Sequence, residues 1–104
     1  MHVAITLFAL AEGRSLDDYE RFAREFIGPR MLELPSVHGF RDGRAVRQMG
    51  GAPAGWDGLE VIEISSPEAF EADHEVSPGK DVAARWLEWI DTYEVAYFQL
   101  INEG

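Results

Sequence analysis

The spacing of apolar and polar residues changes along the chain, and these changes predict an order of strands and helices. Residues 2–11, HVAITLFALA, are rich in β-branched and aromatic residues, which predicts a strand buried on both faces. Across residues 16–27, apolar side chains recur at steps of three and four between charged ones, as in an amphipathic helix. Ser15 stands where it would cap that helix. Residues 28–30, GPR, are expected to bend or interrupt the helix, and Pro35 to close it.

Three further strands are predicted in the rest of the chain. Residues 36–48 form the second strand, and GGAPAG (50–55) is a flexible turn after it. GLEVIEIS (58–65) is dense in β-branched residues and predicts a third strand, and YEVAYFQLIN (93–102) predicts a fourth.

Two helices are predicted between the third and fourth strands. Ser66 followed by Pro67 is a helix start, and residues 68–74 continue it as a short helix. Ser77-Pro78 repeats the same signal before a second helix. The apolar face of that helix is predicted to carry Val82, Ala83, Trp86, Trp89 and Ile90.

The predicted order is strand, helix, strand, strand, helix pair, strand. This βαββαβ order is typical of an α+β, ferredoxin-like domain with an antiparallel four-stranded sheet and helices on one face. We expect one domain over residues 1–104. The first strand is apolar on both sides, with Val3, Ile5 and Leu7 opposite Ala4, Thr6 and Phe8. A second copy of the sheet would cover the open face, which predicts a homodimer.

Composition excludes several classes of function. The chain has 104 residues, 46% hydrophobic and 27% charged, with a formal net charge of -10. That acidity argues against nucleic acid and against anionic membrane surfaces as partners. The absence of cysteine excludes disulfide scaffolds, thiolate zinc sites and cysteine nucleophiles. The apolar N-terminal run is too short to cross a bilayer and lacks a basic leader, so we expect a cytoplasmic protein.

Sequence motifs for common cofactors are absent. No HExxH or clustered set of His, Asp and Glu has the spacing of metal ligands. No GxGxxG, P-loop or GxSxG motif occurs either. We therefore expect no metal, no nucleotide cofactor and no serine nucleophile.

Several short motifs together resemble a known group of enzymes. They are a helix that closes on LPSV, a strand with Phe40 and Arg44, a glycine-rich turn, LEVIEIS, and Phe70 followed by Asp73. This set resembles the dimeric α/β-barrel superfamily, which includes antibiotic-biosynthesis monooxygenases, EthD-like proteins and stress-responsive barrel proteins. Within it, the chain is most similar to the RedY-like proteins of prodiginine and related pyrrole or indole pathways. The resemblance implies a pocket between sheet and helices, and chemistry on aromatic intermediates without a bound cofactor.

The second strand carries the first candidate site. His38, Phe40, Asp42 and Arg44 fall at even spacing and are expected to share one face. His38 is a candidate acid or base at the pocket, because the reference pKa of histidine lies near neutrality. The alternative is a solvated edge strand whose charges block aggregation.

Glu60, Glu63 and His74 are the other candidate catalytic residues. The two glutamates are three residues apart on a central strand, so they face opposite sides, and one of them is expected in the pocket with a raised pKa. A salt bridge to an arginine or across a dimer interface is the alternative. His74 is expected to reach a ligand at the pocket mouth, or else to be an exposed loop histidine.

Substrate-binding residues are expected among the aromatic side chains. Tyr19 and Trp86 are candidates for the pocket wall or the core, and Phe40 and Asp73 belong to the motifs named above. Trp56 follows the glycine-rich turn and is a candidate lid over a flat ligand, or a cover for an edge of the core.

These observations lead to one function and two alternatives. The first is a small cofactor-independent enzyme of secondary metabolism, which binds an indole- or pyrrole-type intermediate and directs its cyclisation or rearrangement. The second is a cofactorless monooxygenase of such an intermediate. The third is a non-catalytic protein that binds and shields it.

Overall fold

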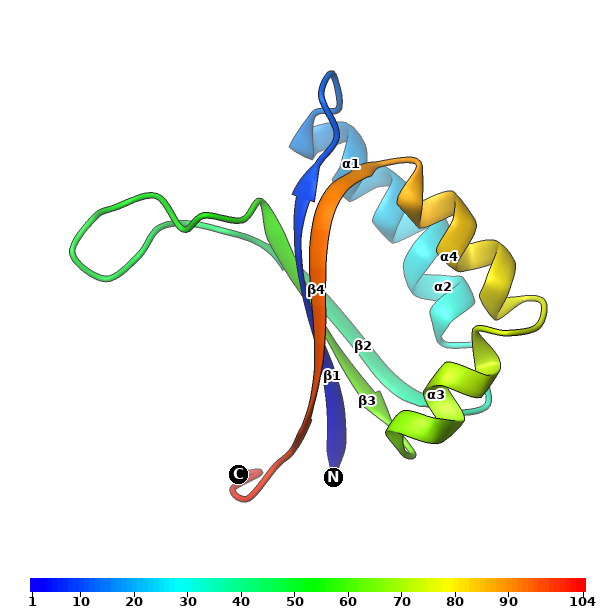
Figure 1. Ribbon diagram of the computed structural model, residues 1–104. Helices are drawn as coiled ribbons and strands as arrows, with labels where there is room; N and C mark the ends of the chain where they lie inside the picture. The colour runs from blue at the N-terminus through cyan, green and yellow to red at the C-terminus, as the bar shows by residue number, and fades with distance from the viewer.

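Four strands form one antiparallel sheet in the computed structural model, which describes all 104 residues (Figure 1). The strands are β1 (His2–Leu10), β2 (Val37–Arg44), β3 (Gly58–Ile64) and β4 (Ile90–Gln99). Their order across the sheet is β2-β3-β1-β4, so β3 and β1 are central and β2 and β4 are edges. The helices cover one face only. The predicted α+β, ferredoxin-like βαββαβ architecture is confirmed.

The first helical segment runs without a break through α1 (Leu16–Phe22), η1 (Ala23–Ile27) and α2 (Gly28–Met31). Ser15 caps it as predicted, because its hydroxyl oxygen accepts the Asp18 amide at 3.1 Å.

The expected interruption at residues 28–30 is wrong in one respect. The helix continues past Pro29, and η1 before it is a π-helical turn in which the Gly28 amide bonds to the carbonyl of Ala23. The wider π turn lets the chain pass the proline, which has no amide hydrogen and whose ring crowds an ordinary α-turn.

The second helical segment contains α3 (Pro67–Asp73) and α4 (Gly79–Leu87). Ser66 caps α3 by accepting the Ala69 amide at 3.1 Å. Ser77 does not cap α4, because Pro78 occupies the cap position and no side chain bonds there. Helix α4 is also shorter than predicted, since Ile90 already belongs to β4.

The ends of β2 and β4 were predicted less well than the rest of the fold, because pairing with a neighbouring strand determines where each of them begins and ends. Strand β2 was predicted to reach residue 48 but ends at Arg44, opposite the first residue of β3. Residues 45–57 instead form a loop that projects beyond the sheet, away from the helices (Figure 1). Strand β4 runs along β1 from Ile90, opposite Leu10, to Gln99, opposite His2, and not over residues 93–102.

The two faces of the sheet differ in what covers them. Ala4, Thr6 and Phe8 point toward the helices, and Ala4 and Phe8 belong to the main hydrophobic core with Ile62. Val3, Ile5 and Leu7 point to the open face, which no helix covers; Val3 is nevertheless buried, whereas Ile5 and Leu7 are partly exposed. No helix has the length and apolar character needed to cross a membrane.

Candidate active site

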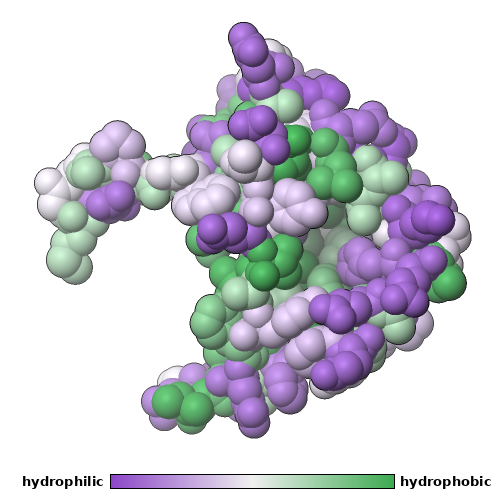
Figure 2. Space-filling view, in the orientation of Figure 1, coloured by the Kyte–Doolittle hydropathy of each residue, from purple (hydrophilic) through white to green (hydrophobic).

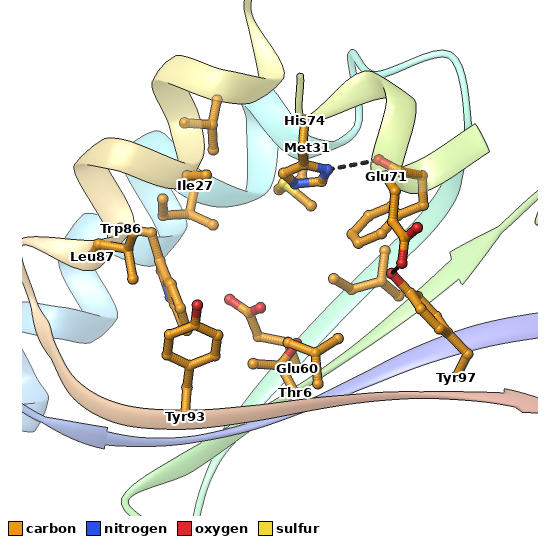
Figure 3. Close-up of a pocket in the computed structure, with 15 residues that line it drawn as sticks. Thr6, Ile27, Met31, Glu60, Glu71, His74, Trp86, Leu87, Tyr93 and Tyr97 are labelled. Carbon is orange, nitrogen blue, oxygen red and sulfur yellow. Dashed lines mark hydrogen bonds between the residues drawn. The ribbon is translucent and has the colours of Figure 1, made fainter. Parts of the chain in front are cut away.

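A cavity of about 290 Å³ lies between the sheet and the helical layer (Figure 3). Fifteen residues line it, and eleven of them are hydrophobic. It opens beside the edge strand β4, where Tyr93 and Val95 are 49% and 43% exposed. Figure 2 shows the hollow between sheet and helices, with apolar residues gathered around it. A concave, mainly apolar pocket with a few polar groups is the usual form of a small-molecule site.

Glu60 is the acidic group on the floor of the cavity. Its side chain points from β3 toward the helices and is only 6% exposed (Figure 3). Burial and, to a lesser extent, the nearby charge of Asp42 together raise the pKa of Glu60 to about 8, against a hydrogen bond with the Thr6 side chain that lowers it. The carboxyl group is therefore mostly protonated at neutral pH and can donate a proton into the cavity.

His74 lies across the cavity from Glu60, just after the last residue of α3 (Figure 3). Its Nδ1 is 2.8 Å from the carbonyl oxygen of Phe70. A carbonyl can only accept, so Nδ1 carries the hydrogen and Nε2 of the neutral ring keeps its lone pair. Nε2 has no hydrogen-bond partner in the protein, which leaves it free to accept a proton from a ligand. The ring also packs on Phe70 at 4.4 Å between centroids.

Aromatic side chains wall the cavity near its opening. Trp86 and Tyr93 meet edge to face with centroids 5.3 Å apart. Trp86 also donates its indole hydrogen to the Tyr19 hydroxyl oxygen at 2.9 Å, which fixes the orientation of the indole ring. At the other end, the Tyr97 hydroxyl donates to a carboxylate oxygen of Glu71 at 2.9 Å. Burial and this carboxylate raise the pKa of Tyr97 to about 12.

Asp42 and Tyr19 lie behind Glu60. Asp42 of β2 is the direct cross-strand partner of Glu60, so the two carboxyl groups project from the same face of the sheet. Burial raises the pKa of Asp42 as well. Tyr19 is buried, and its hydroxyl feels the charges of both acids, with burial the larger cause of its raised pKa. The charge of Asp42 favours the neutral form of Glu60.

Three of the predicted site residues, Glu60, His74 and Trp86, come together in this cavity. Glu63 does not, because it points to the open face of the sheet, where its side chain lies over Gly39. His38 is exposed and its Nε2 is 2.6 Å from the Ser65 hydroxyl. The expectation that His38 shares a face with Phe40 is wrong, because a bulge between Val37 and Gly39 breaks the alternation of β2.

The remaining predicted residues lie around the cavity or away from it. Tyr19 lines a smaller crevice between α1 and β2, on the far side of Trp86. Phe40 packs against the core beside Gly28. Asp73 accepts the Ser36 amide at 2.9 Å and so ties the end of α3 to the turn before β2. Trp56 lines a shallow pocket at the base of the 45–57 loop, which shares no residue with the main cavity.

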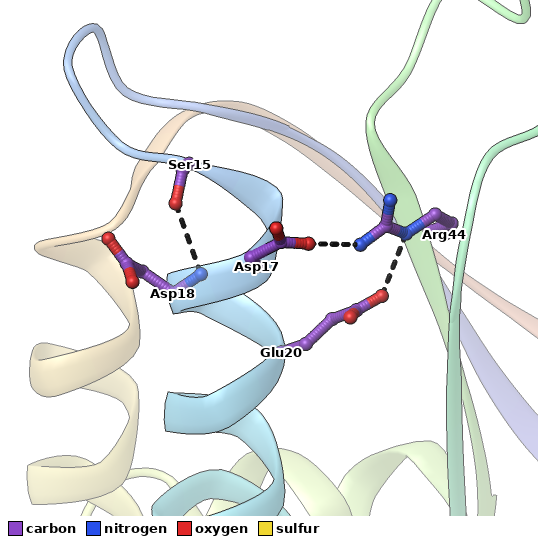
Figure 4. Close-up of polar contacts among 5 residues, drawn as sticks. All are labelled: Ser15, Asp17, Asp18, Glu20 and Arg44. Carbon is purple, nitrogen blue, oxygen red and sulfur yellow. Dashed lines mark hydrogen bonds and ion pairs between the residues drawn. The ribbon is translucent and has the colours of Figure 1, made fainter.

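Arg44 has a structural contact of its own. Its guanidinium group donates to Glu20 at 2.8 Å and to Asp17 at 3.0 Å, and so joins the edge strand to α1 (Figure 4). The hydrogen bond from Arg44 lowers the pKa of Glu20.

Sequence reasoning missed four cavity residues that carry a hydroxyl or carboxyl group: Thr6, Glu71, Tyr93 and Tyr97. The sequence did contain a pattern that marks three of the inward-facing positions of β4. Tyr93, Val95 and Tyr97 recur at every second residue in a strand that is otherwise largely polar, which marks one face. No group of three or more His, Asp or Glu side chains is arranged to hold a metal ion.

Known proteins resemble the chain over nearly its whole length. The family model described as REDY-like protein HapK matches residues 2–101. The crystal structure of HapK from Hahella chejuensis is 26% identical with a TM-score of 0.81, and covers 100% of this chain and 96% of its own. No protein with a curated description matches in sequence.

Two more distant structures share the fold. A dimeric ferredoxin-like protein of unknown function from Thermobifida fusca is 16% identical with a TM-score of 0.71, over 95% of this chain and 90% of its own. The hydroxynitrile lyase of Passiflora edulis is 13% identical with a TM-score of 0.75, over 99% of this chain and 94% of its own. The same architecture therefore supports catalysis in at least one relative.

Proposed function

The chain belongs to the family of REDY-like HapK proteins, and on that premise we propose that it is a small cofactor-independent enzyme of secondary metabolism. It binds an aromatic intermediate of indole or pyrrole type between sheet and helices and directs the cyclisation or rearrangement of that intermediate. The observation that carries the proposal is the pairing of Glu60, a buried acid, with His74, a free base, on opposite walls of one apolar cavity.

The proposed chemistry uses one proton donor and one proton acceptor. The Glu60 carboxyl group donates its proton to a carbon of the electron-rich ring, which leaves a ring cation beside the new carboxylate. A nucleophilic atom of the same molecule then forms the new bond. Nε2 of His74 takes the proton that the nucleophilic atom loses as this bond forms and passes it to solvent, and solvent returns a proton to Glu60. A hydrogen and the nucleophilic atom have then added across one double bond of the ring, so the product is an isomer of the substrate and no oxidant is needed.

The cavity also contributes by orientation. Flat aromatic walls at Trp86, Tyr93 and Tyr97 limit how a planar ring can lie between Glu60 and His74. Heteroaromatic intermediates react readily by themselves, so holding one conformer away from water selects one product.

The test compares Glu60→Gln with Glu63→Gln. Both changes remove one carboxylate from β3, but only Glu60 faces the cavity. With a panel of indole- and pyrrole-type substrates and product analysis by mass spectrometry, Glu60→Gln and His74→Gln are each expected to lower turnover by about 10²-fold or more. Glu63→Gln is expected to retain turnover.

The outcomes separate the alternatives. Unchanged product profiles in Glu60→Gln and His74→Gln, with the ligand still bound, would indicate a binding or shielding protein. Turnover that stops without oxygen would indicate a cofactorless monooxygenase. Turnover that continues without oxygen supports the proposed cyclisation or rearrangement.

We also propose that the protein is a homodimer formed by packing of the open sheet faces. The open face carries the partly exposed Ile5, Leu7, Leu59 and Val61, and Phe98, which is 51% exposed in the single chain. Light scattering at micromolar concentration is expected to give the mass of two chains. Phe98→Asp is expected to yield monomers, whereas Leu32→Asp, at an exposed residue after α2, keeps the dimer. A wild-type protein that is monomeric at that concentration contradicts the proposal.

A further inference from the structure

The charged groups of the cavity are acidic. The titratable side chains that line it are Glu60, Glu71, His74, Tyr93 and Tyr97, and no lysine or arginine is among them. The protein as a whole has a formal net charge of -10. An anionic ligand would enter against this potential, and no fixed cation would meet it inside.

Glu60 has no cationic partner within the protein. The four ion pairs of the chain join other residues, two of them at Arg44, and all have exposed side chains. The protein partner of the Glu60 side chain is the Thr6 hydroxyl, and the carboxyl group points into the cavity. A buried acid without a counter-ion is well suited to receive one from a ligand, because an ion pair offsets the cost of burying the charge.

Aromatic rings stand beside this acid. Trp86 and Tyr93 form a corner of two rings that meet edge to face at 5.3 Å, on the side of the cavity where the Glu60 carboxyl group points (Figure 3). The faces of such rings attract cations and are common in sites for organic ammonium groups. A carboxyl group and an aromatic corner together therefore suit a positively charged nitrogen.

From this arrangement we propose that the cavity selects aromatic ligands that carry a protonated amine, with Glu60 as the counter-ion, and rejects ligands that carry a carboxylate in its place. The inference rests on the proposed function, because it assigns a charge to the aromatic ligand of the same cavity. With such a ligand bound Glu60 is a carboxylate, so the proton that it donates to the ring in the proposed chemistry is first passed to it by the ammonium group, which becomes the neutral amine.

Binding of a ligand that carries a protonated amine changes the number of protons bound to the protein. The ligand keeps its ammonium proton, and Glu60 releases its carboxyl proton to the buffer as the ion pair forms. Affinity for the cation therefore rises with pH until Glu60 is ionised in the free protein. The charged and titratable groups that face Glu60 are Asp42 from β2, Tyr19 from α1, and His74, Glu71, Tyr93 and Tyr97 around the cavity. Protonation of His74 would weaken cation binding in the same direction, so a variant at Glu60 is needed to separate the two.

The test uses three ligands that share one ring and differ in charge: tryptamine, 3-ethylindole and indole-3-propionate. Titration calorimetry at pH 8 is expected to give the tightest binding for tryptamine and the weakest for indole-3-propionate, with at least a tenfold difference in Kd. Tryptamine binding is expected to release protons, which is measured by repeating the titration in buffers with different ionisation enthalpies.

Two variants make the result specific. Glu60→Gln is expected to remove most of the preference for tryptamine and the proton release, whereas Glu63→Gln, on the other face of β3, keeps both. Thermal melting of each variant checks that it is folded.

The possible results separate the two proposals. Equal or tighter binding of indole-3-propionate, or a preference for tryptamine that survives in Glu60→Gln, overturns the inference and leaves the aromatic site standing. Failure of all three indoles and of matching pyrroles to bind overturns the proposed function itself.

Discussion

The two faces of the central strand β3 place the same residue type in opposite settings. Glu60 points toward the helices, is 6% exposed and has a pKa raised to about 8 by burial and by Asp42. Glu63 points to the open face, is half-buried and has no partner beyond its approach to Gly39. The two glutamates are only three residues apart in sequence. Whether the helices cover the face that carries the carboxyl group therefore decides whether that group is a buried proton donor or a surface carboxylate.

The largest expected consequence of this difference is in the pH dependence of stability. The folded protein holds a proton on Glu60 up to about pH 8, whereas the unfolded chain releases it near the ordinary glutamate pKa of 4.5. Between these values unfolding releases a proton, so stability falls as pH rises. The full shift corresponds to roughly 5 kcal/mol of unfolding free energy.

Urea denaturation at pH 5 and pH 9 measures this effect. Glu60→Gln is expected to remove most of the decline with pH, and Glu63→Gln to leave it in place. An equal decline in wild type and Glu60→Gln would contradict the assignment of the buried proton to Glu60.

Substitution of Gly58 and of Gly39 by alanine compares how tightly the two faces of the sheet are packed. A Cβ at Gly58 would meet the ring of Phe8 and the backbone carbonyl of Gly43, neither of which can move freely. A Cβ at Gly39 would meet only the flexible carboxylate end of Glu63. We expect Gly58→Ala to destabilise the protein by about 1–3 kcal/mol and Gly39→Ala by clearly less. Chemical denaturation at one protein concentration checks this, and equal losses would contradict the difference in packing.

The smallest expected effect concerns the cross-strand neighbour of Glu60. Asp42→Asn removes a negative charge from the same face, so the pKa of Glu60 is expected to fall by about one unit or less. Burial is the larger cause of the raised pKa, so most of the shift should remain. Carbon-detected NMR titration measures it, with Asp91→Asn at the exposed start of β4 as a control that should change nothing. A return of Glu60 to its ordinary pKa in Asp42→Asn would show that charge, and not burial, dominates.

Much of the fold was predictable because each element has its own periodicity. The three- and four-residue steps of the first helix and the β-branched run of β3 were enough to give the order of elements. Strand ends were less predictable, because β2 ends opposite the first residue of β3 and β4 follows the length of β1. The bulge at His38 also depends on pairing with β3, and no local pattern marks it.

The site was predictable only in part. The sequence indicated that one of Glu60 and Glu63 faces the pocket, but both have apolar neighbours, so alternation alone could not choose between them. The choice depends on which face the helices cover. Tyr93 and Tyr97 were missed because their strand was predicted to begin three residues late and its inward face was not identified.

The measurement that tests the account most directly is the pKa of Glu60 in the wild-type protein. Selective ¹³C labelling of glutamate, with Glu60→Gln and Glu63→Gln to assign the two side-chain signals, allows both carboxyl groups to be followed from pH 4 to pH 10. We expect the Glu60 signal to titrate near pH 8, as burial in the cavity requires. Titration of Glu60 near the ordinary glutamate pKa of 4.5 would contradict the assignment of a neutral acid to the cavity, and with it the proposed proton donor.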